Sequence, residues 1–185
     1  MKKIFYLSTL FFLTSCFIGA SQNSKITANK PQHFPFVSGI DLNGKKYELP
    51  NDFAGKINII ALGFEREHQD PINTWIPSID QLIKNTNPQI GLKFYEVPLI
   101  YELSTFQRGW VNNGMRFGIR DETARQRTIT VYTDREEFFK IMDMKGDRIY
   151  LLLVDNNGKI LFQCEGEMTK ENLDKIVKLI AKQAQ

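Results

Sequence analysis

Cysteine and histidine are scarce in this chain, which has two residues of each kind among 185. Two cysteines are too few for a disulfide-rich scaffold, a four-cysteine zinc site or an iron–sulfur cluster. The two histidines, His33 and His68, stand 35 positions apart, which argues against a histidine-rich metal site. We therefore expect no metal ion and no cofactor.

Charge of one sign and several common catalytic motifs are lacking as well. With 24 basic and 21 acidic residues, the net charge of +3 is too small to predict nucleic-acid binding. The chain contains no GxGxxG, HExxH or GxSxG motif, so dinucleotide binding and two common hydrolase chemistries have no support. Apolar residues make up 42% of the sequence, a share typical of globular proteins.

The N-terminus has the pattern of an export signal. Two lysines precede an uncharged run rich in Phe and Leu, which is short for a membrane span. Leu13-Thr14-Ser15-Cys16 resembles a bacterial lipobox, in which the cysteine becomes lipidated, and ordinary cleavage after Ala20 is the alternative. Both interpretations predict an exported protein, and a lipidated Cys16 would anchor it at a membrane surface.

These signals divide the chain into three parts. We expect residues 1–15 to be the signal peptide and residues 16–33, which are mostly polar, to form a flexible tether. Residues 34–185 are expected to form one folded domain.

The spacing of apolar residues predicts an α/β domain. Two continuous apolar runs, Ile57–Phe64 and Tyr150–Val154, are typical of central strands buried on both faces. Asn43-Gly44 predicts a hairpin near the N-terminus, and Asn157-Gly158 predicts another near the C-terminus. Helical spacing occurs in Pro71–Lys84, around Phe106–Phe117, after Asp134 and after Thr169. Helices interleaved with strands favour a three-layer sandwich with a central mixed sheet, an N-terminal β-hairpin and a helical insertion.

Four short motifs along the domain resemble the thioredoxin-like superfamily in its redoxin branch. They are Phe34-Pro35-Phe36, Asp41-Leu42-Asn43-Gly44-Lys45, Phe53-Ala54-Gly55-Lys56 and Asp155-Asn156-Asn157-Gly158-Lys159-Ile160. Their order and spacing cover residues 34–180. The resemblance implies a thioredoxin-like three-layer sandwich, with an active site after the strand at Ile57–Phe64.

The residues that carry redox chemistry in that superfamily are missing. Alignment places Gln69 and Ile72 where redox-active members have the Cys-x-x-Cys, and Ile149 where they have a cis-proline. Without a thiol at Gln69, this site cannot exchange disulfides. The remaining alternative is a thiol oxidoreductase or peroxidase that uses Cys164, although a sheet-packed cysteine explains that residue more simply.

A narrower resemblance covers the last 75 residues. Trp110–Arg120, Thr130–Tyr132, Arg135-Glu136-Glu137 and Ile149–Asp155 resemble the mitochondrial ATP-synthase assembly-chaperone family. That family is similar to thioredoxins, lacks their active-site thiols and assists the assembly of a membrane complex. The resemblance implies no catalytic residues.

The segment Glu65–Asp70 stands where thioredoxin-like proteins place their chemistry. Its carboxylates and one imidazole could bind a metal or act in acid–base catalysis. Adjacent residues do not all face one point, however, and no remote ligand is identifiable. A solvated loop in which Asp70 caps the next helix is the simpler expectation.

Arginine is concentrated in one stretch. Seven of the eight arginines lie between positions 108 and 148, mixed with aromatic residues as in protein interfaces. We predict a partner surface made of Arg116, Arg120, Arg125, Arg127 and Trp110. The alternatives for the arginines are a solvated helix face and a surface for acidic lipid headgroups. For Trp110, as for Trp75, the alternative is a place in helix packing.

The expected function is binding rather than catalysis. We expect an exported, lipid-anchored, redox-inactive thioredoxin-like protein on the periplasmic side of the cell envelope, acting as a chaperone or assembly factor. Its partner would be an envelope or membrane protein, and nucleic acid is not expected. The rivals are a redox enzyme with a degenerate active site and a non-thiol enzyme that uses the Glu65–Asp70 segment.

Overall fold

The computed structural model describes residues 32–183. The expected signal peptide, Cys16 and most of the expected tether lie outside these residues. Gln32 and His33, assigned above to the tether, are already attached to the domain. The backbone N–H of Ile160 donates to the carbonyl of Gln32 at 2.8 Å, and His33 forms an antiparallel bridge with Lys159.

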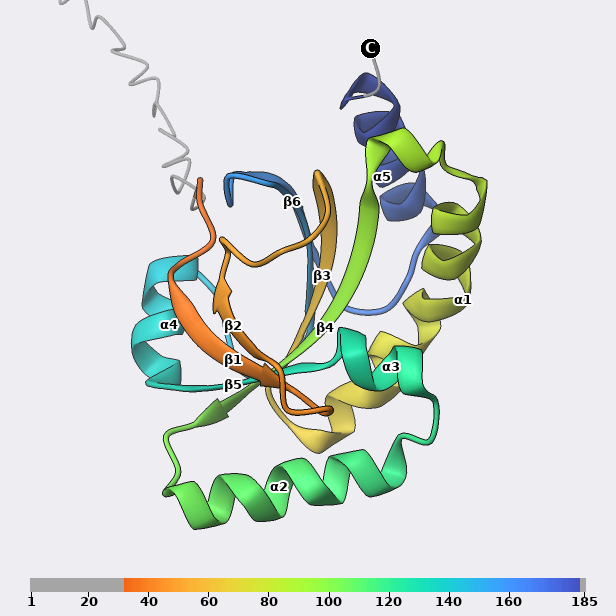
Figure 1. Cartoon of the computed structure of the whole chain (residues 1–185). Helices are drawn as coiled ribbons and strands as arrows, with labels where there is room; N and C mark the ends of the chain where they lie inside the picture. The colour runs from red at the N-terminus through yellow and green to blue at the C-terminus, as the bar shows by residue number, and fades with distance from the viewer. Residues whose placement is uncertain (1–31, 184–185) are drawn as a thin grey trace, which may run out of the picture.

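A seven-stranded mixed sheet runs through the domain in the order β2-β1-β5-β4-β3-β6-β7 (Figure 1). The central pairs β3–β4 and β4–β5 are parallel, and the other pairs are antiparallel. The strands are β1 Val37–Asp41, β2 Lys46–Leu49, β3 Ile57–Gly63, β4 Leu92–Tyr101, β5 Ile129–Thr133, β6 Tyr150–Asp155 and β7 Ile160–Glu165. Both predicted hairpins and both predicted central strands are confirmed.

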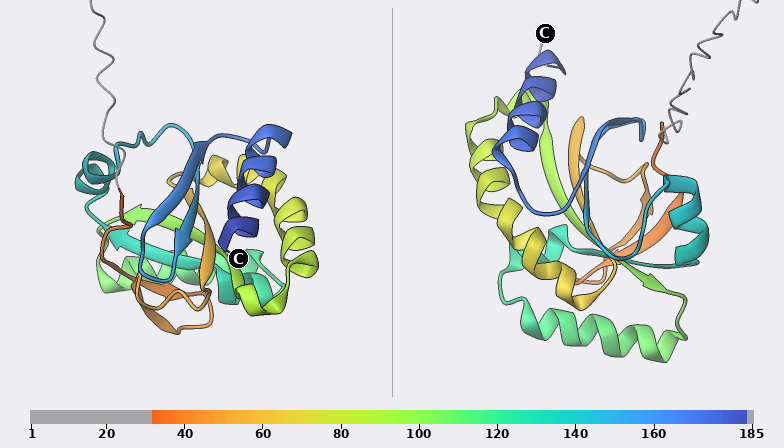
Figure 2. Two further views of the ribbon diagram at one scale, coloured as in Figure 1. Left: turned by 90° about the horizontal axis from the view of Figure 1, so that it is seen from above. Right: turned by 180° about the vertical axis from the view of Figure 1, so that it is seen from behind.

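Helices cover both faces of the sheet, which confirms the three-layer sandwich. The helices α1 (Gln69–Asn85) and α5 (Lys170–Gln183) pack side by side on one face, as Figure 2 shows, and α4 (Arg135–Met142) covers the other. The insertion between β4 and β5 contains α2 (Thr105–Gly118) and α3 (Glu122–Arg127). No helix among residues 32–183 is both long enough and apolar enough to cross a membrane.

The strand β3 shows why the sequence folds this way. All seven of its residues are buried, and its alternate side chains enter the apolar clusters on opposite faces of the sheet. Asn58 is the buried polar exception, and its amide exchanges two hydrogen bonds with the backbone of Gly55. Trp75 is fully buried under α1, as predicted, and its indole N–H donates to the carbonyl of Gly166 at 3.0 Å.

The helix starts test three predicted caps. Asp134 and Thr169 accept backbone N–H groups at the starts of α4 and α5, as predicted. The prediction for Asp70 was wrong, because a short 3₁₀ helix, η1 (Arg66–His68), leads directly into α1 and places Asp70 inside the helix. The short helix α3, capped by Asp121, was not predicted.

Candidate binding groove

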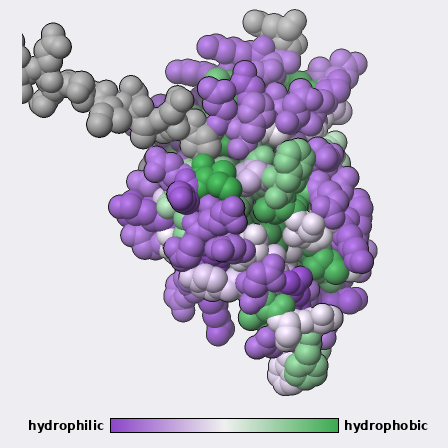
Figure 3. Space-filling model, turned by 90° about the vertical axis from the view of Figure 1, so that its left-hand side faces the viewer, coloured by the Kyte–Doolittle hydropathy of each residue, from purple (hydrophilic) through white to green (hydrophobic). Residues whose placement is uncertain are grey.

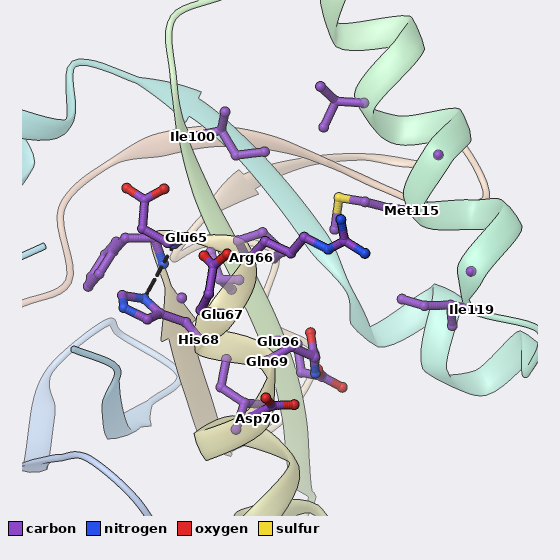
Figure 4. Close-up of a pocket in the computed structure, with 18 of the residues that line it drawn as sticks. Glu65, Arg66, Glu67, His68, Gln69, Asp70, Glu96, Ile100, Met115 and Ile119 are labelled. Atoms are coloured by element: carbon purple, nitrogen blue, oxygen red, sulfur yellow. Dashed lines mark hydrogen bonds between the residues drawn. The ribbon is translucent and has the colours of Figure 1, made fainter. Parts of the chain in front are cut away.

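An open groove of about 1080 Å³ lies where the resemblance places a redox active site. One wall is η1 with the first turn of α1, and the other is α2. The end of β4 forms the floor between them. Figure 4 shows charged side chains on the η1 wall and apolar side chains, including Met115 and Ile119, on the opposite wall.

His68 has a structural role at the η1 wall, where it binds the backbone just before η1. It is buried, and its Nδ1 accepts the backbone N–H groups of Phe64 at 3.0 Å and Glu65 at 3.3 Å. A ring nitrogen that accepts two hydrogen bonds carries no proton, so these contacts assign the neutral tautomer protonated at Nε2. The imidazole therefore holds η1 in place.

The sequence alignment assigns Gln69, Ile72 and Ile149 to the positions of the redox residues, and the first two line the groove. Gln69 is exposed at the first residue of α1, and its amide donates to Glu96 at 3.1 Å and to Asn73 at 3.0 Å. Ile72 and Ile149 are buried in the same apolar cluster on the α1 and α5 face. The structure thus brings an amide and two aliphatic side chains to this end of the sheet, and none of them can exchange electrons.

A buried carboxylate, Glu96, lies in the groove beside Gln69. Only 6% of Glu96 is exposed, and its other oxygen accepts from Arg127 Nε at 3.2 Å. Arg127 also pairs with Asp80 at 2.9 Å and stacks over the ring of Phe94. Because the carboxylate is compensated and hydrogen-bonded, this cluster stabilises the junction of β4, α1 and α3.

A second buried charge, Arg135, supports η1 from the side of α4. It is 4% exposed and donates through Nη2 to Glu65 Oε1 at 2.9 Å. Its guanidinium stacks on Tyr101 and lies near the rings of Phe64 and Phe139. The Nε atom is buried without a hydrogen-bond partner among the described residues. Sequence reasoning missed this role, because nothing local distinguishes Arg135 from its neighbours.

The α2 wall stands apart from the core. None of the side chains in α2 is buried by the described residues, and Val111 and Met115 face the groove. Tyr132 on β5 ties the helix to the sheet, since its hydroxyl donates to Asn112 Oδ1 at 2.8 Å. Burial raises the pKa of Tyr132, so this hydroxyl keeps its proton. A Cβ added at Gly114 would meet no described atom within 4 Å, so the groove is open there.

The structure divides the predicted arginine surface. Arg127 is used in the pair with Glu96, and Arg125 donates to Asn43 and to the backbone carbonyls of residues 119 and 120. Arg116 and Arg120 are exposed. Trp110 is 72% exposed, which contradicts the alternative of a place in helix packing and leaves it available to a partner.

Cys164 lies away from the groove. It is half-buried on β7, opposite Leu151, and packs against the apolar cluster beneath α1 and α5. Within residues 32–183, no three His, Cys, Asp or Glu side chains gather closely enough to hold a metal ion.

Comparison with solved structures relates this architecture to known proteins. A Sco-family cytochrome c oxidase assembly protein, BsSco, is 12% identical with a TM-score of 0.56, over 83% of this chain and 94% of its own. A thiol:disulfide interchange protein from Bacteroides is 18% identical with a TM-score of 0.53, over 82% and 90%. The exposed lipoprotein thioredoxin of Streptococcus pneumoniae is 14% identical with a TM-score of 0.51, over 78% and 98%.

The sequence itself matches no family model and no curated protein. The resemblance to ATP-synthase assembly chaperones stays a prediction. Since the structural neighbours share the sheet and its flanking helices at low sequence identity, what they establish is the architecture: this chain has the thioredoxin-like fold.

Proposed function

We propose that this chain is an exported, lipid-anchored, redox-inactive thioredoxin-like protein that binds part of an envelope or membrane protein as a chaperone or assembly factor. The observation that carries the proposal is the groove itself. It lies where the thioredoxin-like resemblance implies an active site, and the same resemblance assigns Gln69 and Ile72 to the positions of the thiols. A site that keeps the concave surface and loses the nucleophile is suited to binding.

The chemistry of the two walls favours a polypeptide ligand. Val111, Met115 and Ile119 offer an apolar strip, while Arg66 and Glu67 on the opposite wall offer charged hydrogen-bonding groups. In Figure 4 the side chain of Arg66 extends across the groove toward Met115. A segment with apolar side chains on one side and polar groups on the other would match both walls.

Anchoring through Cys16 is the second part of the proposal. The lipobox-like sequence supports it, and one structural neighbour is named a lipoprotein and another an oxidase assembly protein. Mass spectrometry of the mature N-terminus should find an acylated Cys16. An unmodified chain that begins at Ser21 would contradict the anchor.

The mature chain should not turn over disulfides. Cys164 packs beside the α1 and α5 cluster and does not reach the groove, so Cys164→Ser should fold and function normally. An insulin-reduction assay with dithiothreitol measures the activity directly, and we expect no rate above the uncatalysed reaction. A rate that vanishes with Cys164→Ser, at unchanged stability, would favour the redox enzyme instead.

Filling the groove should prevent partner binding. A photo-reactive residue at Met115 should crosslink the partner in the native membrane, and Gly114→Trp should reduce that crosslink at least tenfold. The added ring would occupy open space in the groove, and a tenfold loss corresponds to about 1.4 kcal/mol.

Gly109→Trp is the matched control for this variant. Gly109 lies on the same helix, also has open space around an added Cβ, and does not line the groove. It should keep the crosslink, and neither variant should lower the melting temperature, because replacing glycine favours a helix. Equal crosslinking by both variants would mean that the groove is not the partner site.

A further inference from the structure

Three aromatic side chains of α2 are largely exposed, and one of them, Trp110, also lines the edge of the groove. Phe106, Trp110 and Phe117 are 76%, 72% and 91% exposed, and their spacing of four and eleven residues places them on one side of the helix. Tyr132, which ties α2 to the sheet, binds Asn112 on the opposite side. Figure 1 shows α2 at the outer limit of the molecule, and Figure 3 shows uncovered apolar residues at this lower end.

The charge on α2 has a single sign. From Thr105 to Arg120 the segment carries Arg108, Arg116 and Arg120 and no acidic residue. On a helical projection Arg116 lies to one side of the aromatic residues and the groove lies to the other, and Arg120 follows two residues after the end of α2. Both arginines are exposed, so they can meet an anionic surface at the same time as the aromatic stripe.

These features discriminate between possible binding partners of the aromatic stripe, which consists of Phe106, Trp110 and Phe117. A second copy of the chain, paired stripe to stripe, would bring together two helices that each carry Arg116 and no acidic residue of their own, since Glu102 is already paired with Arg108. A protein hot spot normally lies in an enclosed, desolvated pocket, whereas these three rings are at least 72% exposed. Phe and Trp on one side of a helix, with Arg beside them, is the composition of helices that lie in a membrane interface.

We propose that α2 is a membrane-docking helix, which inserts Phe106, Trp110 and Phe117 between anionic phospholipid headgroups while Arg116 and Arg120 bind their phosphates. The proposal extends the proposed function, because docking would hold the groove next to the bilayer where a membrane partner emerges. It is compatible with the anchor at Cys16, since residues 17–31 could span about 50 Å when extended. That reach allows the far side of the domain to touch the membrane.

The test is vesicle binding by the mature chain without its lipid. The protein is residues 16–185 with Cys16→Ser, and the vesicles are phosphatidylcholine with or without phosphatidylglycerol. We expect the protein to co-sediment with the anionic vesicles. This binding should be lost at high salt concentration, because salt screens the contacts between arginine and phosphate. Replacing all three aromatic residues with Ser should weaken binding at least tenfold without lowering the melting temperature, since these side chains are exposed in the free protein.

The arginine contribution has a matched control. Arg116→Gln with Arg120→Gln should weaken binding about fivefold for each charge removed. Lys178→Gln with Lys182→Gln removes the same charge from exposed positions on α5 and should leave binding unchanged. The fluorescence of Trp110 should shift to shorter wavelength with anionic vesicles, whereas Trp110→Phe, which retains only the buried Trp75, should show no shift.

Three outcomes would overturn the proposal. They are no binding to anionic vesicles, equal losses from the α2 and α5 charge variants, and a dimer in solution that the aromatic replacements abolish. Vesicle binding needs no partner protein and no lipid on Cys16, so its failure leaves the groove crosslink and the N-terminal acylation as separate tests. Loss of the groove crosslink would likewise leave vesicle binding intact.

Discussion

Arg127→Glu should lower the free energy of unfolding by about 3–5 kcal/mol. The wild-type guanidinium is the cation that compensates Glu96, whose carboxylate is only 6% exposed, and it also pairs with Asp80. Breaking a buried pair by removing one partner leaves an uncompensated charge away from water. The new glutamate would add a further negative charge between the two carboxylates.

Urea unfolding of the two proteins measures this effect. Arg116→Glu is the matched control, because it makes the same charge change on the exposed surface of α2 and should alter stability by about 0.5 kcal/mol or less. Adding Glu96→Gln to the Arg127→Glu variant should restore part of the loss, since the buried negative charge is then absent. If Arg127→Glu and Arg116→Glu were equally stable, the pair with Glu96 would contribute nothing.

This contrast shows where sequence reasoning about the arginines stops. Arg116 and Arg127 have the same chemistry and lie eleven residues apart in one arginine-rich segment, so composition assigns both to one surface. The difference comes from the pairing of β4 with β5, which carries Arg127 to Glu96, 31 positions away in the chain. Long-range contacts of this kind leave no local pattern.

The fold was largely predictable because its signals are local. The continuous apolar run of β3 required a strand buried on both faces, and the Asn-Gly turns fixed the two hairpins. The position of the groove followed from the order of elements, since Gln69 stands at the start of the helix after β3.

The place of α2 was not predictable from periodicity. A stripe of apolar residues at helical spacing normally faces a core, and this pattern made helix packing the alternative to a partner surface for Trp110. Here α2 lies beyond the sheet at the edge of the domain, and none of the described elements forms a further layer over its aromatic residues. Periodicity identifies which residues share a side of a helix, whereas only the tertiary arrangement decides whether that side is buried.

Removing the negative charge from Glu65 should cost more stability than removing the positive charge from Arg135. Glu65→Gln leaves a guanidinium that is 4% exposed without a compensating anion, and we expect a loss of about 2 kcal/mol. The estimate lies below the range for fully buried pairs because the Glu65 side chain is 55% exposed to water. The glutamine retains a carbonyl that can accept a hydrogen bond, so the change isolates the charge.

Arg135→Met should cost about 1 kcal/mol or less, because it removes a desolvated cation together with the unpartnered Nε atom. The methionine can still pack against Tyr101 and Phe139, where sulfur–aromatic contacts are favourable. Glu67→Gln changes the same charge on the neighbouring exposed residue of η1 and should leave the unfolding midpoint in place. A larger loss of stability from Arg135→Met than from Glu65→Gln would contradict this expectation. It would show that stacking of the guanidinium on the three rings outweighs the cost of desolvating the cation.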